Sequence, residues 1–456
     1  MKARWLLLCL VAVACAERRP AGTAGWAAQV PSNAVRYVAQ AAPLPTAQAQ
    51  PVPAPVAPPA EPVARPFVSA ITEPTTITLW HAYRATEADA LRQVVERFHA
   101  LGTKLTVQLR AVPFDAMNDK MKVVVPEGKG PDLVVFAHDL VGAWAEMGII
   151  EPLSSLTTEE DTAGFLPETV QPLVYKSALY GLPLAFKCVA LYYDTARIPT
   201  PPRTWDELVA LAKQHTSVTD ARFGLVGEVG NLYFHAPWLL GLGGEVLGPD
   251  DEVRIDSPAA VEALLKVRSL VKEHRVVPPA VTTAMVSGYF NDKKAAMALN
   301  GPWMRGEIDP GVRYGVAPLP ELAPGKPARP FLGVEALMLN HHTTKKAAAL
   351  EVMRYLVRDE SAQLRFEVAK QTVANRRVWQ AAEKSGALDP TMAAFRAQAA
   401  VSVPMSSSPR MQQMWTPYND ALHSVLSGDA EPAAALKEAQ ATAVASAKAA
   451  GGGARP

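Results

Sequence analysis

The sequence predicts an α/β fold of two lobes, each built from discontinuous segments around mixed, mainly parallel sheets. Three observations predict it. Strand-like and helix-like patterns alternate between residues 77 and 136, which favours a parallel sheet. The apolar run LPLAFKCVALYY over 182–193 is broken at Lys187-Cys188, as expected where a strand leaves one sheet and enters another. The chain then ends in helical patterns, which indicates segments that return to pack on both lobes.

The individual elements follow from the period of the apolar residues, which is two in a strand and about 3.6 in a helix. A second crossing between the lobes is expected just before residue 331. The predicted strands lie at 77–80, 105–112, 133–136, 222–227, 294–299, 313–317 and 331–340. The predicted helices lie at 86–100, 115–125, 344–357, 361–370, 409–427 and 432–448, with two more that begin after Thr204 and at Pro258.

The stretch from Gly130 to Asp139 is central to the first lobe. Gly130-Pro131 signals a turn, and Leu133–Phe136 is an apolar run typical of a strand in the middle of a parallel sheet. Ligands of open α/β sheets bind outside the carboxyl ends of the strands. His138 and Asp139 are therefore expected at a ligand-facing edge, and Asp139 could also cap the helix that follows.

Composition bounds the function. The 456 residues, 49% of them hydrophobic, suffice for two or three domains with large cores. A net charge of +1 gives no reason to expect nucleic acid or a membrane surface as a partner. The three cysteines, Cys9, Cys15 and Cys188, build neither a disulfide framework nor a cysteine metal site, and His341-His342 reads as a loop. No metal site and no cofactor are predicted.

The N-terminus resembles an export signal. Lys2 and Arg4 precede a short apolar core that is too short to span a bilayer, and small residues follow before Cys15. Residues 1–15 are expected to be a signal peptide. Cys15 is expected to be acylated, as in a bacterial lipoprotein; the alternative is that the mature protein is secreted in soluble form. Residues 16–74 are rich in Pro and Ala and are expected to form a disordered, polyproline-like tether, and residues 448–456 a disordered tail.

Five motifs then occur in one order along the chain. They are Gly130-Pro131-Asp132 to Ala137-His138-Asp139, Leu191-Tyr192-Tyr193-Asp194 with Pro201-Pro202-Arg203-Thr204-Trp205-Asp206-Glu207-Leu208, Asn300-Gly301-Pro302-Trp303, Tyr314-Gly315-Val316 with Leu319-Pro320, and Phe331-Leu332-Gly333-Val334. Over about residues 75–447 the chain resembles the periplasmic-type solute-binding proteins of bacterial ABC importers, and among them the maltose and maltodextrin binders.

The resemblance implies the arrangement of the whole chain. It implies one lobe from 75–184 and 333–380, another from 185–332 and 385–447, and a three-segment hinge with crossings near 184–188, 329–335 and 376–388. An oligosaccharide would bind between the lobes of a monomer, without a cofactor. The partners would be the permease subunits of an ABC transporter and a separate ATPase, since the sequence has no Walker-type phosphate loop.

The resemblance also implies ligand-binding residues. Trp303 and Trp415 match sugar-stacking tryptophans, Tyr233 a ligand tyrosine and Asp139 a ligand carboxylate, while Phe136 stands where the family has another stacking aromatic. Pyranose rings present C–H faces to aromatic rings and hydroxyls to carboxylates, so these residue types suit a sugar. Phe136 could instead be strand core, and Trp415 part of a Met-rich core helix.

Several positions depart from the maltose-binding pattern. Lys187 stands where a glutamate is expected, Leu140 replaces an arginine, Asn231 replaces an acid, and Arg84 lies near the first strand. The site thus loses acids and gains Lys187 and Arg84, which suggests either a different glycan or an acidic or phosphorylated solute, because a buried lysine needs an anionic partner. A salt bridge between the lobes, from Lys187 to Glu335, is the structural alternative.

Three classes of function fit these observations. The leading one is a non-enzymatic protein that captures an oligosaccharide and delivers it to an ABC permease. A sensory ligand-binding ectodomain is the second. A glycan-cleaving enzyme is the third and is disfavoured, because no local motif fixes the paired acid and base that glycoside hydrolysis needs, so no catalytic residue is predicted.

Overall fold

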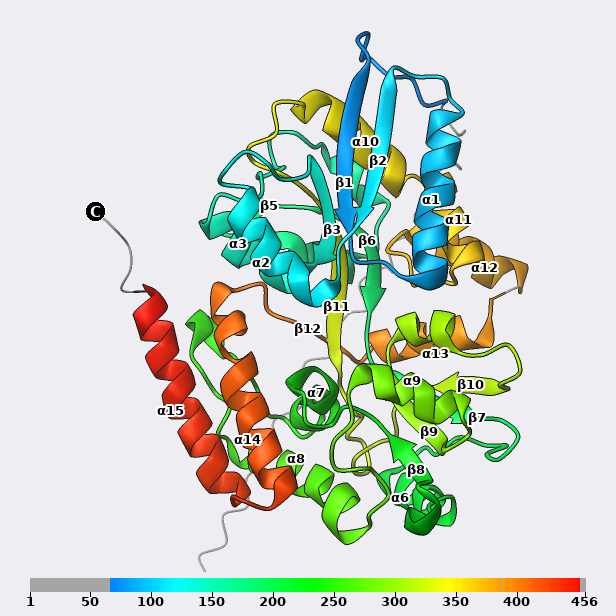
Figure 1. Ribbon diagram of the computed structural model, residues 1–456, viewed down its shortest axis with the longest axis vertical. Helices are drawn as coiled ribbons and strands as arrows, with labels where there is room; N and C mark the ends of the chain where they lie inside the picture. Colours follow the sequence, from blue (N-terminus) through cyan, green and yellow to red (C-terminus); the bar gives the residue numbers. More distant parts are fainter. Residues whose placement is uncertain (1–65, 387, 452–456) are drawn as a thin grey trace, which may run out of the picture. The chain divides into compact units, whose positions relative to one another are not determined.

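The computed structural model describes residues 66–386 and 388–451, and Figure 1 draws their helices and strands. The predicted signal peptide, Cys15 and the tether up to residue 65 lie outside the described residues. No helix of the described part is long and apolar enough to cross a membrane.

The first lobe is built on a six-stranded sheet of order β12-β11-β3-β1-β2, with β6 paired to β11 off this path. The parallel strands β1, β2 and β3 fit the prediction, whereas β11 runs antiparallel to both β3 and β6. Its strands are β1 (Thr75–His81), β2 (Leu105–Ala111), β3 (Leu133–Ala137), β6 (Leu182–Lys187), β11 (Phe331–Leu339) and β12 (Val403–Pro404). Its helices are α1 (Ala85–His99), α2 (Phe114–Val124), α3 (Val141–Glu146), α4 (Glu159–Ala163), α5 (Pro167–Val170), α10 (Lys346–Val357) and α11 (Asp359–Val368).

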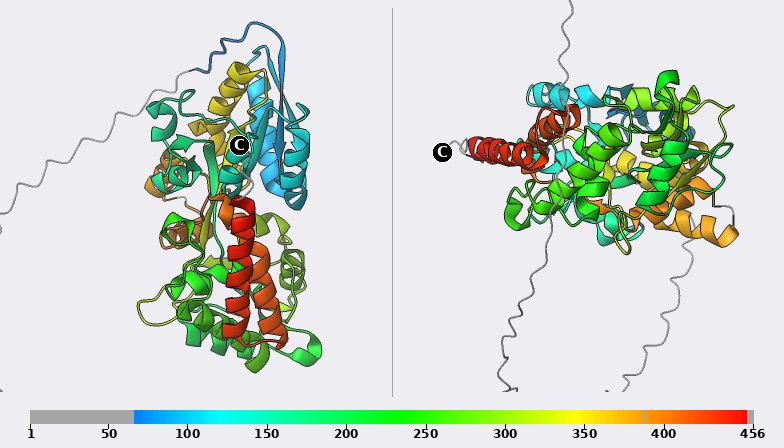
Figure 2. Two further views of the ribbon diagram at one scale, coloured as in Figure 1. Left: turned by 90° about the vertical axis from the view of Figure 1, so that its left-hand side faces the viewer. Right: turned by 90° about the horizontal axis from the view of Figure 1, so that it is seen from below.

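The second lobe is built on a four-stranded sheet of order β10-β7-β9-β8. Figures 1 and 2 show α14 and α15 packed side by side along this lobe. Its strands are β7 (Ala190–Asp194), β8 (Phe223–Val226), β9 (Ala295–Asn300) and β10 (Tyr314–Ala317). Its helices are α6 (Trp205–Gln214), α7 (Leu232–Gly241), α8 (Pro258–Arg268), α9 (Thr283–Asn291), α13 (Pro390–Ala399), α14 (Trp415–Ser427) and α15 (Pro432–Gly451).

The chain passes between the sheets where the sequence indicates a change of partner. β6 ends at Lys187 in the first sheet, and β7 begins three residues later in the second. β11 returns the chain to the first sheet, and α12 (Arg376–Ser385) leads it back to α13. Trp379 of α12 stacks on Phe186 of β6, with ring centroids 5.8 Å apart, so the crossings pack against one another.

The packed chain extends further at both ends than the sequence indicates. The ring of Phe67 lies edge-on to those of Phe98 and Tyr355, at 5.6 and 5.4 Å, and the Ser69 hydroxyl donates to Glu351 over 2.6 Å. The expected tether therefore does not reach residue 74. At the other end α15 continues to Gly451, past the expected start of the tail at 448.

A fully buried histidine lies in α7. His235 is 0% exposed, and neither of its ring nitrogens has a hydrogen-bond partner among the described residues. The ring packs against those of Trp238 and Tyr418, with centroids 6.0 and 5.7 Å away. Burial lowers the pKa of His235 to about 3, because the charged imidazolium would lose its water without gaining a partner.

The substitution His235→Leu is expected to reduce the acid sensitivity of the fold. Histidine in the unfolded chain has a pKa near 6.5, whereas that of folded His235 is about 3. Below pH 6.5 the unfolded chain therefore binds a proton at this position that the folded chain does not bind, so the free energy of unfolding falls as the pH falls. This loss should amount to about 2 kcal/mol between pH 7 and pH 5 in the parent and be absent from the variant. Urea unfolding at both pH values measures it, with His342→Leu as an exposed control; equal losses in parent and His235→Leu would contradict it.

Candidate ligand-binding site

Four aromatic rings form a continuous series at the junction of the lobes. The ring of Trp303 lies 6.2 Å from that of Tyr233, Tyr233 lies 6.4 Å from Phe331, and Phe331 lies 6.5 Å from Trp415, centroid to centroid. These spacings are those of interacting aromatic pairs. Phe331 is buried, whereas Trp303, Tyr233 and Trp415 remain partly exposed. The structure thus brings together three of the residues predicted from the sequence.

Gly301 explains why the motif Asn300-Gly301-Pro302-Trp303 places its tryptophan so firmly. A Cβ atom at Gly301 would lie 2.0 Å from the ring of Trp303, so only glycine allows the ring to fold back over the backbone. The Asn300 side chain accepts a hydrogen bond from the Gly301 N–H over 2.9 Å, and the Tyr192 hydroxyl donates to the Gly301 carbonyl over 2.8 Å. The turn is therefore fixed from both sides.

Tyr233 is held by the start of α7. Asn231 caps this helix, since its side-chain oxygen accepts from the Tyr233 N–H over 2.9 Å. Asparagine at this departure from the family pattern thus has a structural role. The Tyr233 hydroxyl lies near Gly333 of β11, 3.7 Å from where a Cβ would stand. Burial above all, then the charges of Cys188, Asp139 and Glu335, raise the Tyr233 pKa well above its usual value, so the hydroxyl is neutral.

Asp139 also lies at this junction, but not as a helix cap. It belongs to the short helix η1 (His138–Leu140), and its side chain caps neither η1 nor α3, contrary to the sequence-based alternative. Its carboxylate accepts a hydrogen bond from the side-chain amide of Gln412 over 2.8 Å. Gln412 lies in η7 (Pro409–Gln413), three residues before Trp415. Asp139 of the first lobe is therefore linked to the segment that carries a predicted stacking ring.

His138 fastens the same edge. Its Nδ1 accepts a hydrogen bond from the Val334 N–H over 2.9 Å, so Nε2 carries the proton and donates to the Met405 carbonyl over 2.8 Å. The end of β3 is thereby joined to β11 and to the chain that leads to η7. Burial outweighs the charge of Asp139 and lowers the His138 pKa, which keeps the ring neutral.

Lys187 forms an ion-pair cluster beside the rings. Its Nζ lies 2.6 Å from Glu335 Oε1 and 3.2 Å from Glu87 Oε1, and it lies 5.5 Å from the ring centre of Trp303. The Gln371 side-chain amide donates to both carboxylates, over 3.3 Å to Glu335 and 3.4 Å to Glu87. The expected salt bridge from Lys187 to Glu335 is therefore present, but it joins the neighbouring strands β6 and β11 of the first sheet and not the two lobes.

The pKa values of both Lys187 and Glu335 in this cluster are raised, but for different reasons. Burial disfavours the charged form of Lys187, but the charges of Glu335 and Glu87 outweigh it, so the pKa of Lys187 is raised and the ammonium persists. Burial and the charge of Glu87 raise the pKa of Glu335 against the pull of Lys187, because two carboxylates share one ammonium. The anion that a buried lysine needs is supplied by the protein. Lys187 therefore gives no reason to expect an acidic ligand.

Two predicted site residues make other contacts. Phe136 is only 5% exposed and stacks between Phe114 and Trp144, at 4.6 and 5.8 Å, which is the strand-core role that the sequence left open. Arg84 pairs with Glu307 over 3.2 Å, and its side chain is 71% exposed. The structure does not join either residue to the ring series through a ring contact, hydrogen bond or ion pair among the described residues.

Sequence reasoning missed four residues of this junction. Phe331 was noted only as part of a motif, and nothing in the neighbouring sequence predicted that its ring would lie between those of Tyr233 and Trp415. Gln412, Glu87 and Gln371 come from three distant segments, and nothing in their neighbourhoods marks them. Among the described residues, no group of three His, Cys, Asp or Glu side chains is placed to hold a metal ion.

Comparison with known proteins identifies the family of the chain. Residues 84–363 match the family of bacterial extracellular solute-binding proteins. The chain belongs to this family. Like the solved structures it resembles, this solute-binding protein has the two-lobed α/β fold.

Individual relatives of this solute-binding protein bind oligosaccharides. The chain is 26% identical to a maltotriose-binding protein of Pyrococcus abyssi, over 77% of each chain. It is also 26% identical to a galactooligosaccharide-binding protein of Bacillus subtilis, over 73% of this chain and 80% of that one. The structure of a Thermus thermophilus maltotriose-binding protein bound with maltotriose superposes with a TM-score of 0.72 at 28% identity, covering 80% of this chain and 98% of the other.

Proposed function

We propose that this solute-binding protein captures a neutral oligosaccharide of the maltodextrin class between its lobes. The observation that carries the proposal is the ring series of Trp303, Tyr233, Phe331 and Trp415, drawn from four separate elements and lying beside the ion-pair cluster of Lys187. The three partly exposed rings, Trp303 and Tyr233 on one side of the buried Phe331 and Trp415 on the other, offer stacking faces to pyranose units. The maltotriose and galactooligosaccharide specificities of the relatives support the same class of ligand.

Specific side chains would then hold the hydroxyl groups. Asp139 is the proposed carboxylate acceptor: its Oδ2 accepts from the Gln412 amide, and its Oδ1, which has no hydrogen-bond partner in the described part of the chain, can accept from a sugar. The Tyr233 hydroxyl, kept neutral by burial, can both donate and accept. Lys187, whose ammonium lies 5.5 Å from the ring centre of Trp303, is proposed to hold that ring in place, while Trp303 and Trp415 carry the stacking.

Because the chain belongs to a family of extracellular solute-binding proteins, we also propose how the bound sugar is delivered to a transporter. The lobes would close over the sugar by bending at the three crossings, and the closed form would dock on the permease of an ABC transporter whose ATPase is a separate chain. We propose that Cys15 carries a lipid and that residues 16–65 tether the binding lobes to the membrane surface. Mass spectrometry of the mature N-terminus tests this part separately.

The sugar proposal predicts a change in tryptophan fluorescence on titration with maltotriose. Because Trp303 and Trp415 are partly exposed, a stacked pyranose should remove water from them and shift their emission. We expect saturable binding of maltotriose, weaker binding of maltose, and no response to glucose 6-phosphate, since Lys187 is already paired. Silence for maltotriose, longer maltodextrins and galacto-oligosaccharides alike would contradict the proposal.

A further inference from the structure

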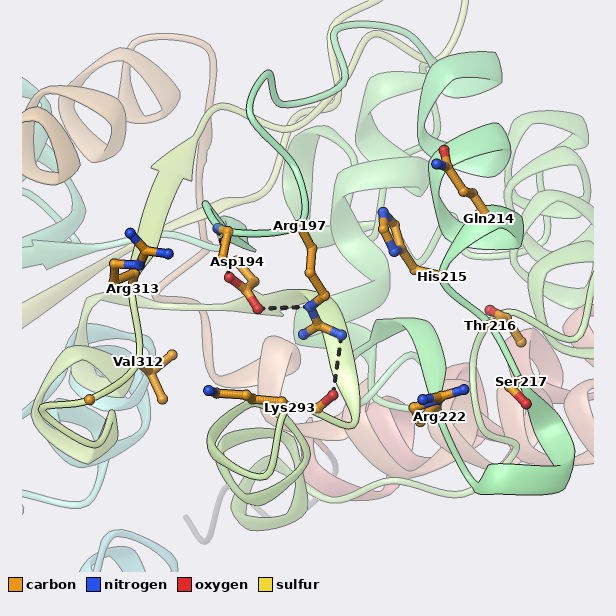
Figure 3. A pocket seen from close by; sticks show the side chains of 12 residues that line it. Asp194, Arg197, Gln214, His215, Thr216, Ser217, Arg222, Lys293, Val312 and Arg313 are labelled. Atoms are coloured by element: carbon orange, nitrogen blue, oxygen red, sulfur yellow. Dashed lines mark hydrogen bonds and ion pairs between the residues drawn. The ribbon is translucent and has the colours of Figure 1, made fainter.

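A cavity separate from the ring series lies in the second lobe, at the end of its sheet where β7 stops and β8, β9 and β10 begin. Its volume is about 440 Å³, and none of the ring-series residues lines it. A basic residue stands near the end of each of these strands: Arg222 and Arg313 directly precede β8 and β10, Lys293 lies two residues before β9, and Arg197 lies three residues after β7. The antiparallel pairing of β7 with β9 and β10 brings these four side chains to one cavity (Figure 3).

Arg197 is pinned within this cavity. Its Nε donates to Asp194 over 2.7 Å, its Nη1 donates to the Lys293 carbonyl over 3.1 Å, and its Nη2 donates to the Ala295 carbonyl. Figure 3 shows the guanidinium held between Asp194 and Lys293. Three of its five N–H groups are used, which leaves one on each terminal nitrogen. The cavity thus contains a guanidinium with two unused donors that is already ordered before any ligand arrives.

The charges around the cavity do not balance. Asp194 offsets Arg197, and Asp220 pairs with Arg222 over 2.7 Å. Lys293 and Arg313 have no carboxylate within ion-pair distance in the described part of the chain. Two positive charges therefore remain at one cavity, although the whole chain carries a net charge of only +1.

His215 adds a neutral polar group to the lining. Its Nε2 is buried and has no hydrogen-bond partner among the described residues. Burial, together with the charge of Arg197, lowers the pKa of His215, so the ring is neutral and can offer one donor or one acceptor. An unused polar atom of this kind calls for a ligand or a water molecule.

We propose that this cavity binds a small molecule carrying a phosphate monoester. Such a group carries between about −1.5 and −2 charges at pH 7, which matches the two unbalanced cations. Arginine N–H groups suit phosphate oxygens as paired donors, and lysine contributes a compact charge. The volume lies within the usual range of about 300–1,000 Å³ for ligand pockets, so an organic portion fits beside the phosphate. This site is separate from the proposed sugar site and does not depend on it.

The test uses the full mature chain and glycerol 3-phosphate as the probe, with binding measured by calorimetry. We expect saturable binding that Lys293→Gln with Arg313→Gln weakens by at least about tenfold. The control, Lys326→Gln with Lys437→Gln, removes two exposed lysines of the same lobe outside the cavity and should leave binding as in the parent. Maltotriose binding, followed by fluorescence, should be the same in all three proteins.

Several results would overturn the proposal. They are an absence of binding at millimolar glycerol 3-phosphate, equal losses in the cavity variant and the control, and competition by maltotriose, which would place the phosphate at the junction of the lobes. Sedimentation with vesicles that contain phosphatidic acid, without binding of the soluble ester, would identify a lipid headgroup instead of a small molecule. If only the titration with sugars fails, the proposal for the phosphate site is not affected.

Discussion

Replacement of Trp303 by alanine is expected to weaken maltotriose binding by at least about a hundredfold, which corresponds to about 3 kcal/mol. The ring is partly exposed, stands at one end of the aromatic series, and is polarised by the Lys187 ammonium 5.5 Å from its centre. Its removal would take away both a stacking face and the surface that keeps water from the neighbouring tyrosine. Calorimetric titration with maltotriose measures the loss.

Trp205→Ala provides the matched control for this substitution. Trp205 is a partly exposed tryptophan of the same lobe with a lysine over its ring, since Lys266 Nζ lies 4.7 Å from the ring centre. It is not part of the ring series, so its loss should leave affinity within about twofold of the parent. The prediction for Trp303 is wrong if both variants bind alike, and thermal unfolding shows whether either has lost its fold.

Much of the fold was predictable because its signals are local. The apolar run at Leu133–Ala137 gave a central strand, and the break at Lys187-Cys188 marked the point where the chain changes sheets. The antiparallel pairing of β11 with β3 and β6 had no such signal, since these strands lie about 200 and about 150 residues away from β11 in the sequence. The contact of Phe67 with the first lobe was hidden for the same reason, because the composition around it reads as a linker.

A residue of the candidate site could be predicted from the sequence where a single neighbouring residue in a turn fixes the position of its side chain. Trp303 is such a case, because Gly301 leaves room for its ring. Phe136 shows the opposite, since an aromatic at the end of a central strand suits either a ligand or the core, and only Phe114 and Trp144 on its two faces decide for packing. The carboxylates that pair with Lys187 come from α1 and β11, which are far from it in the sequence. The residues around Lys187 therefore could not show that its charge is neutralised by Glu87 and Glu335.

Lys187→Met is expected to destabilise the fold by about 3–5 kcal/mol at pH 7, because it leaves Glu87 and Glu335 as two buried charges without an ammonium. Lys187→Arg, which keeps the charge, should lose much less, and the double change Lys187→Met with Glu335→Gln should recover part of the loss. Urea unfolding of the four proteins measures these differences.

The pH dependence separates this structural role from a ligand role. Glu335 already has a raised pKa, and removal of Lys187 raises it further, so the carboxyl binds a proton in the folded variant before it does so in the unfolded chain. Folding of the variant is therefore favoured as pH falls, and its deficit relative to the parent should shrink between pH 7 and pH 5. A lysine that served only to hold an anionic ligand would behave otherwise: its replacement would abolish binding while leaving the unfolding free energy within about 1 kcal/mol of the parent at both pH values.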